Sequence, residues 1–355
     1  MADWLKSMQQ TFEYYVVDPG TWKDSKLLDT VKSCTISRDS TAETLGSASF
    51  DLTESVGECY IRVYLVTIQN GIRERFPLGT FLVQTPSSSF DGKIRTASVD
   101  AYTPLLELKE NPPPLGYSIF KDENVMEHAY RIIREHARAP VMETKADDTL
   151  YSDFVANTSD TWLTFCTDLI ANAKYLFDLD EMGRILFQPE QDTASLQPVW
   201  TFDDGNSSIL YPDIDLTHDL YDIPNVVEVI YSQDGVYCYG RAENNDANSP
   251  ISTVSRGREI LYRESNPSFS GTPTNAQVQL YAEQLLRNKS TLEYSISYSH
   301  GYCPVRVGDC VRLNYTRAGL KNIKAKVTSQ SIKCEPGCAV SETASFTNKL
   351  WGDTL

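Results

Sequence analysis

Residues 61–83 read IRVYLVTIQNGIRERFPLGTFLV, and this stretch decides the class of the fold. Its first five residues alternate between apolar Ile61, Val63 and Leu65 and the more polar Arg62 and Tyr64 between them, which is the period of a β-strand. An Asn-Gly pair at 70–71 then tolerates the positive φ of a tight turn, and a second extended run follows. The stretch therefore predicts an antiparallel hairpin.

The β pattern extends over residues 14–102, with a second turn predicted at Asp91 and Gly92. An antiparallel barrel or sandwich of about 100 residues is typical of such a pattern. Residues 111–116 read NPPPLG, and three consecutive prolines remove three backbone donors. Because no helix or central strand can cross this segment, we place a domain boundary there.

The hydrophobic period changes after the prolines. Apolar residues between 125 and 136 recur at helical spacing, so a helix is expected to begin near Asp122. A second helix is predicted for residues 161–173, with Asp160 as its N-cap, and a hairpin for residues 175–188. From residue 199 the chain returns to strands, interrupted by one helix at 275–288. We therefore predict three domains: a β domain at 1–110, an α+β insertion at 111–198 and a second β domain at 199–355.

The composition is that of an ordinary globular protein, with 41% hydrophobic and 23% charged residues among 355. The net charge of −16 argues against a surface that binds nucleic acid by neutralising phosphates. No apolar run approaches the roughly 20 residues needed to cross a membrane, and residues 1–7 do not resemble a signal peptide. We expect a chain that is made and assembled in the cytoplasm, without stable membrane binding.

Four of the eight cysteines crowd into one C-terminal stretch, namely Cys303, Cys310, Cys334 and Cys338. Cys334 and Cys338 flank a three-residue loop and are expected to face each other across a hairpin. Four thiolates brought together would suit zinc or an iron–sulfur cluster. The spacing is not that of a standard zinc finger, so inert core thiols and disulfides stay open as alternatives.

Other reactive side chains give weaker patterns. His128 and His136 lie eight residues apart on the first predicted helix without a zinc-protease motif, and His218 and His300 stand alone in β segments. Acidic clusters at 178–181, 203–204 and 213–215 could form a carboxylate pair for glycoside hydrolysis, but each lies where a turn is expected. The sequence contains no phosphate-binding glycine loop or nucleophile elbow, so we do not expect an enzyme.

Several segments, in order along nearly the whole chain, resemble the hub proteins of phage tails and baseplates. This family includes the hub of contractile tails, the late-control protein D group and the base of the type VI secretion spike. The resembling segments are residues 33–40 (SCTISRDS), 46–51 (GSASFD), 76–83 (FPLGTFLV), 99–108 (VDAYTPLLEL), 222–227 (DIPNVV), 255–260 (SRGREI) and 307–313 (VGDCVRL).

The resemblance implies a mainly β fold with two tube-like antiparallel β-barrel domains and a small α+β domain between them. It implies a homotrimer whose six barrels form a pseudo-sixfold ring, placed in the virion at the tail baseplate or tip. The expected partners are the tail tube or distal tail protein, the central spike or fibre protein and the tape-measure protein. DNA would pass through the lumen only in transit, and an acidic wall would repel it.

Tail-tip proteins of lambda-like phages, which resemble this family, carry an iron–sulfur cluster on four C-terminal cysteines of comparable spacing. The resemblance thus favours Cys303, Cys310, Cys334 and Cys338 as metal ligands, although the lengths between them differ. Two alternatives to a purely structural hub remain. One is a tail-associated cell-wall hydrolase with the middle domain as its catalytic unit, and the other is a host-glycan-binding tail protein, prompted by 20 Tyr and 5 Trp.

Overall fold

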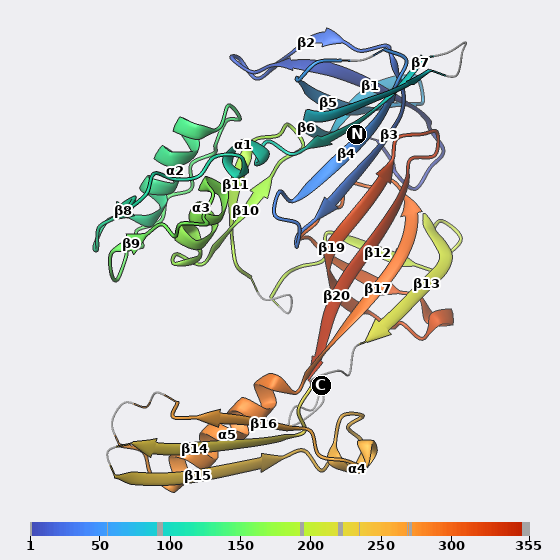
Figure 1. Cartoon of the computed structure of the whole chain (residues 1–355). Coiled ribbons are helices and arrows are strands. Elements are labelled where there is room, and N and C mark those ends of the chain that lie inside the picture. Colours follow the sequence, from blue (N-terminus) through green and yellow to red (C-terminus); the bar gives the residue numbers. More distant parts are fainter. Residues whose placement is uncertain are drawn as a thin grey trace. The chain divides into compact units, whose positions relative to one another are not determined.

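The computed structural model describes residues 2–54, 56–90, 95–191, 195–218, 223–233, 235–267, 269 and 272–349 (Figure 1). Within them the chain is mainly β, with antiparallel pairing predominant and helices gathered in two places, which confirms the predicted fold class. The turn predicted at Asp91 and Gly92 lies outside the described residues.

The first part of the chain is made of strands alone. The predicted hairpin is confirmed, because Asn70 and Gly71 adopt φ of 52° and 79° between two paired strands. The strands are β1 (Gln9–Asp18), β2 (Lys23–Leu27), β3 (Val31–Asp39), β4 (Gly46–Leu52), β5 (Tyr60–Gln69), β6 (Ile72–Phe90) and β7 (Arg95–Tyr102).

Strand β5 is buried on both faces, so its sequence alternation does not separate core from solvent. Arg62 is only 1% exposed, and its guanidinium donates to the Thr80 hydroxyl at 2.9 Å, the Asp24 carboxylate at 2.8 Å and the Met182 carbonyl at 3.0 Å. A buried arginine is stable only when its donors are satisfied, and these three partners meet that requirement. Arg62 thereby connects β5 to the insertion by a hydrogen bond.

The insertion is α+β, as predicted. The first helix begins at Val125 rather than near Asp122, because Asn124 is its N-cap and accepts from the Glu127 N–H at 3.0 Å. The insertion is preceded by α1 (Leu106–Lys109), and its elements are β8 (Ser118–Ile119), α2 (Val125–His136), β9 (Phe154–Val155), α3 (Trp162–Ala171), β10 (Tyr175–Leu179) and β11 (Ile185–Pro189).

The N-cap predicted for the second helix is wrong by one residue. Thr161 caps α3 through a reciprocal capping box with Thr164, whereas Asp160 accepts from the Asn157 N–H at 2.7 Å. The hairpin predicted for residues 175–188 is confirmed as β10 and β11.

The remaining residues form strands and three short or medium helices within the described ranges. They are β12 (Trp200–Asp203), β13 (Leu210–His218), β14 (Val226–Gln233), β15 (Val236–Glu243), α4 (Thr253–Arg256), β16 (Leu261–Ser265), α5 (Asn275–Lys289), β17 (Thr291–Gly301), β18 (Cys310–Asn314), η1 (Thr316–Ala318), β19 (Ile323–Lys333) and β20 (Ala339–Lys349).

One sheet joins the two ends of the chain. In the described ranges thirteen strands belong to it, and its main path runs β13-β17-β20-β19-β3-β4-β7-β6-β5-β1-β2, with β18 on β19 and β12 on β18. The junction is the antiparallel pair of β19 and β3, in which Ser329 lies opposite Asp39 and Lys333 opposite Thr35 (Figure 1). The N-terminal and C-terminal β segments are therefore parts of one continuous sheet.

Two hydrophobic cores support this arrangement. One is shared between the N-terminal strands and the C-terminal segment, since Ile36 and Phe50 belong to the same buried cluster as Ile332 and Val340. The other fills the insertion, where α2 and α3 pack on each other and share a buried cluster with Tyr60 of β5 and with Trp22 in the turn between β1 and β2. The insertion is thus packed onto the β region through a common core.

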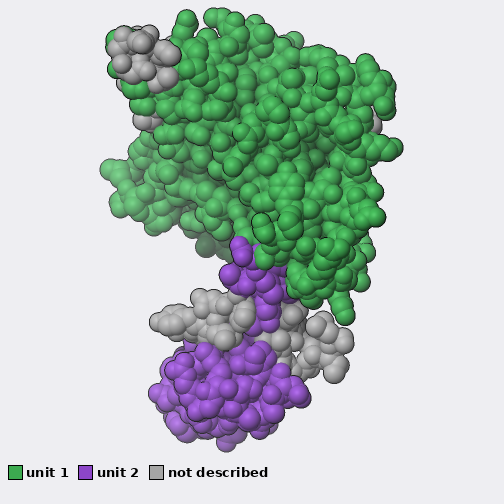
Figure 2. Space-filling model, turned by 90° about the vertical axis from the view of Figure 1, so that its right-hand side faces the viewer, with its two compact units in different colours: residues 1–214, 297–344 green, residues 215–296, 345–355 purple. Residues whose placement is uncertain are grey.

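The contacts divide the chain into two compact units, coloured separately in Figure 2. Unit 1 comprises residues 1–214 and 297–344, and unit 2 comprises residues 215–296 and 345–355. The three-domain division made from the sequence stays a prediction, and residues 215–296 are a compact part that it did not separate from the second β domain.

Unit 2 contains a three-stranded sheet, β15-β14-β16, with α5 packed on one face. Val227, Val229 and Cys238 of the sheet share a buried cluster with Val278 and Leu286 of the helix. Gly240 lets the helix approach closely, because a Cβ built there would lie 2.6 Å from the carbonyl oxygen of Val278 and 2.9 Å from the Cα of Gln279. Both atoms are backbone, so the contact cannot be relieved by a side-chain rotation.

Replacing this glycine tests the packing of unit 2. We expect Gly240→Ala to lower the free energy of unfolding of unit 2 by about 1–3 kcal/mol, since α5 must move away from the sheet. Hydrogen exchange of residues 226–243 and 275–289 should accelerate, while exchange in unit 1 should not change. Gly57→Ala is the matched control, because no atom lies within 4 Å of its added methyl group. Equal stability of the two variants would contradict the close approach.

Candidate functional site

A buried polar network lies where the C-terminal strands approach β3. Tyr298, His300, Gln330 and Glu342 are each at most 3% exposed. The Nε2 atom of His300 lies 3.2 Å from Oε1 of Glu342, and the Tyr298 hydroxyl donates to Oε2 of Glu342 at 2.6 Å. The Gln330 side-chain amide also donates to Glu342, so this carboxylate is the centre of the network.

The polar contacts continue through β3 to the insertion. Arg38 donates to Oε1 of Gln330 at 3.2 Å and lies 3.7 Å from the Glu181 carboxylate in the turn between β10 and β11. Glu181 also pairs with Arg306 at 2.8 Å. Side chains from the C-terminal strands, β3 and the insertion are therefore joined by one chain of hydrogen bonds and ion pairs.

The ionisation of Glu342 is set by two opposing effects. Burial disfavours its charged form, but the His300, Tyr298 and Gln330 side chains stabilise that form and lower the pKa of Glu342 below its usual value. Burial and the neighbouring Glu342 carboxylate both raise the pKa of Tyr298. The network therefore favours a charged Glu342 beside a neutral Tyr298.

The four cysteines of the predicted metal site lie in different surroundings. Cys310 opens β18 opposite Lys326 of β19, and Cys303 lies with its Sγ 3.9 Å from Nδ1 of His300. Cys334 and Cys338 flank the loop between β19 and β20, as predicted, and belong to the core shared with β3. The thiol of Cys334 is in contact with Cys34 of β3. The hydrogen bond between the two thiols raises the pKa of Cys334, and burial raises it further.

These positions do not fit one metal site. Cys334 lies eight residues beyond Lys326 along β19, which at about 3.3 Å per residue puts Cys310 and Cys334 roughly 25 Å apart. Zinc and iron–sulfur clusters need thiolates within about 2.3 Å of the metal. Across the described residues, no group of three or more His, Cys, Asp and Glu side chains is placed to hold a metal ion. The quartet Cys303, Cys310, Cys334 and Cys338 thus does not fit zinc or a cluster in this structure.

The acidic residues at 178–181 and Asp204, considered for hydrolysis, have structural partners. Asp178 and Glu181 lie 3.6 Å and 2.8 Å from the Arg306 guanidinium, and Asp180 pairs with Arg184. Asp204 accepts from the Thr316 hydroxyl at 2.8 Å. Their geometry is that of ion pairs and turn caps, which is a structural use of carboxylates.

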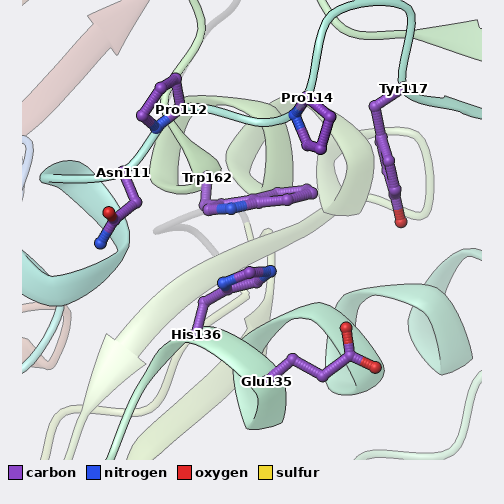
Figure 3. A pocket seen from close by; sticks show the side chains of 7 residues that line it. All are labelled: Asn111, Pro112, Pro114, Tyr117, Glu135, His136 and Trp162. Atoms are coloured by element: carbon purple, nitrogen blue, oxygen red, sulfur yellow. The ribbon is translucent and has the colours of Figure 1, made fainter.

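A pocket of about 340 Å³ lies in the insertion between the proline segment and the ends of α2 and α3 (Figure 3). The His136 ring stacks on Trp162 with 4.4 Å between centroids and 22° between planes. Tyr117 meets Trp162 edge to face at 4.9 Å and 85°. The pocket is lined by Asn111, Pro112, Pro114, Tyr117, Glu135, His136 and Trp162.

Sequence reasoning missed this pocket. In the sequence the triproline segment indicates a boundary and His136 lies on a helix face. Nothing in the sequence relates them, because the lining residues come from three separated segments. The backbone N–H of Trp162 donates to the Asn111 carbonyl at 2.9 Å, which ties the start of α3 to the prolines. The other histidine of α2, His128, lies against Glu123 and Arg131 instead.

Comparison with solved structures identifies the fold. The tail protein of Neisseria meningitidis is similar over 96% of this chain and 98% of its own, with 13% sequence identity and a TM-score of 0.63. The 43 kDa tail protein of a Shewanella oneidensis prophage is similar over 94% and 97%, with 12% identity and a TM-score of 0.60. A chain of the Francisella PdpA–VgrG complex is similar over 97% of this chain and 53% of its own, with 8% identity and a TM-score of 0.57.

No protein-family model matches the chain, and no curated protein matches it in sequence. The chain has the fold of these phage tail proteins, and the resemblance inferred from its sequence segments is confirmed at the level of the fold.

The carboxylate at the centre of the polar network makes stability depend on pH. Folding lowers the pKa of Glu342, so the ionised carboxylate adds to the free energy of unfolding. This stabilisation is fully present above the pKa of an unfolded glutamate, about 4.3, and is lost as the pH falls through the lower folded pKa. We expect Glu342→Gln to be less stable than the wild type near neutral pH by about 1–3 kcal/mol. Denaturant unfolding should show the two curves converging below about pH 4.

Glu335→Gln is the control for this prediction, since Glu335 is an exposed glutamate in the loop that follows β19. The free energy of unfolding of Glu335→Gln should equal that of the wild type at every pH. A constant difference between Glu342→Gln and the wild type down to acid pH would contradict an ionised Glu342.

The separation of the cysteines predicts the metal content. We expect the folded chain, purified without oxygen, to carry no stoichiometric zinc or iron and to lack the visible absorbance of an iron–sulfur cluster. Metal analysis with thiol titration under denaturing conditions checks this, and eight free thiols are expected. One metal site per chain, lost in Cys310→Ser, would show instead that β18 and β19 rearrange to unite the quartet.

Proposed function

We propose that this chain is a structural hub of a phage or phage-like tail, forming a trimeric, pseudo-sixfold ring that continues the tail tube and anchors a central spike or fibre. The observation that carries the proposal is the match to tail proteins over nearly the whole length of both chains. The similarity therefore extends over all the domains of those tail proteins and is not limited to one of them.

The continuous sheet supports the ring. The pairing of β3 with β19 holds the N-terminal and C-terminal β segments in one sheet, so each copy would contribute two β modules in a set relation. Three copies would then present six modules around an axis, which matches a sixfold tube on one side and a threefold spike on the other.

The two edges of the large sheet support a contact between copies. β2 ends the sheet with exposed Lys23 and Lys26, while β13 ends the other side of the main path with exposed Asp213 and Asp215. Each edge also exposes an apolar side chain, Leu27 on β2 at 49% and Leu216 on β13 at 46%. Two β2 edges would repel each other, and so would two β13 edges, because each pair carries charges of one sign. Pairing of β2 in one copy with β13 in the next brings opposite charges together. Such a head-to-tail contact can close a ring.

The expected partners are other tail components. They are the tail tube or distal tail protein, the spike or fibre protein and the tape-measure protein, and the likeness to a chain of the PdpA–VgrG complex is consistent with assembly into such a device. The net charge of −16 would let DNA pass without adhering to the wall. Among the helices that the structure describes, none is long and apolar enough to cross a membrane.

The two alternative functions receive less support from the geometry. The carboxylates at 178–181 are engaged by arginines, whereas a hydrolase needs a pair facing a substrate cleft. A glycan site usually groups several open aromatic ring faces. Trp22 and Trp162 are only 9% and 4% exposed, and the exposed rings of Tyr151 and Tyr237 belong to different units. A hub that acts through its interfaces therefore fits the described residues best.

A charge exchange at the edges tests the proposal. We expect the wild type to have three times the mass of one chain in solution or in purified tails, and Lys23→Glu with Lys26→Glu to weaken the trimer about tenfold or more, because both edges are then acidic. Adding Asp213→Lys and Asp215→Lys to the same chain should restore the trimer. Mass photometry across a dilution series measures each assembly.

Lys121→Glu with Lys145→Glu is the matched control, since it changes the net charge equally on exposed residues of the insertion. A wild-type chain that stays monomeric alone and in the particle would overturn the hub. A trimer that survives the edge substitutions unchanged would overturn only the assignment of β2 and β13.

A further inference from the structure

The pocket in the insertion has two aromatic walls held at right angles. Trp162 is almost fully buried and holds the other two rings in place. His136 stacks on it, and Tyr117 contacts it edge to face. Tyr117 and His136 are half-buried and border the open part of the pocket together with Glu135 (Figure 3). The ring face of a tyrosine carries negative potential, which attracts cations.

Glu135 adds a negative charge to the same space. It is exposed, it lines the pocket, and in the described part of the chain its carboxylate makes no ion pair or hydrogen bond. Its charged neighbours on α2 are engaged, since Arg134 pairs with Glu143 and Arg131 contacts His128. Glu135 is therefore the charge of this helix end that is available to a ligand.

The position of Glu135 strengthens the negative potential. It is the residue before the last residue of α2, where the helix dipole is negative and where an acidic side chain is unfavourable for the helix itself. The insertion around it is also acidic, with 15 Asp and Glu against 7 Lys and Arg in residues 111–198. Local and domain charge both favour a positively charged occupant.

We propose that this pocket binds a cationic side chain, the guanidinium of arginine or the ammonium of lysine, presented by a partner polypeptide. The cation would pair with the Glu135 carboxylate and lie near the Tyr117 ring. A pocket of about 340 Å³ is at the small end of the range for ligand sites and accepts one long side chain with its flanking groups.

Apolar residues beside the pocket indicate a polypeptide instead of a free cation. Leu115, between two lining residues in the chain, is 87% exposed. Val155, whose neighbour Ala156 donates its N–H to the Tyr117 carbonyl at 2.9 Å, is 55% exposed. An extended segment with a basic residue between apolar ones would cover these side chains while its charge enters the pocket. This inference does not rest on the trimeric hub.

The probe is the capped tripeptide acetyl-Leu-Arg-Leu-amide, and its neutral analogue carries citrulline in place of arginine. The indole N–H signal of Trp162 in a ¹H–¹⁵N spectrum of the full chain reports on the pocket. We expect the arginine peptide to shift this signal saturably, and the citrulline peptide to shift it at least about fivefold more weakly. N-acetylglucosamine is included as a neutral sugar and should leave the signal in place.

Two variants make the test specific. Glu135→Gln keeps the shape of the side chain and should weaken the arginine peptide about fivefold, whereas Glu127→Gln, an exposed glutamate of α2 outside the pocket, should bind as the wild type does. An unchanged Trp162 signal, equal binding of the citrulline peptide or of the sugar, or equal binding by Glu135→Gln would each overturn the proposal. A preserved Trp162 signal in the free variants shows that the insertion remains folded.

Discussion

The pairing of β3 with β19 is the constraint on which the rest of unit 1 depends. Its backbone hydrogen bonds join residues near position 37 to residues near position 331, so the chain must close a very long loop before they form. The cost is offset by the core that both strands share, in which Ile36 and Ile332 are buried together. The β segments paired in this way cannot then move independently of each other.

Arginine side chains extend this rigidity into the insertion. Arg62 reaches the Met182 carbonyl from a strand interior, and Arg38 and Arg306 both approach Glu181 in the same turn. Buried charges of this kind add little net stability, but removing one partner leaves the other uncompensated. The acidic turn at 178–183 therefore acts as an anchor for the insertion, and this accounts for a cluster of carboxylates that has no need of a catalytic role.

Local patterns in the sequence predicted local structure well. The hairpin at Asn70 and Gly71, the buried face of α2 and the β10–β11 hairpin are all present, because each depends on residues within a few positions of one another. The two helix starts were displaced by one to three residues, since Asn124 and Thr161 cap better through their own geometry than the aspartates nearby. The exposure of Arg62 could not be predicted, because the insertion that covers it is distant in sequence.

By itself the sequence determined the β, α+β, β order, the positions of most turns and the acidic character of the chain, because these follow from residue types and short-range periodicity. Only the tertiary structure decided that Cys334 lies against Cys34 and far from Cys310, and that residues 111–117, 135–136 and 162 enclose one pocket. The reason is physical. Which strands pair and which surfaces meet depends on complementary shape and burial across long separations, and spacing along the chain carries no measure of either.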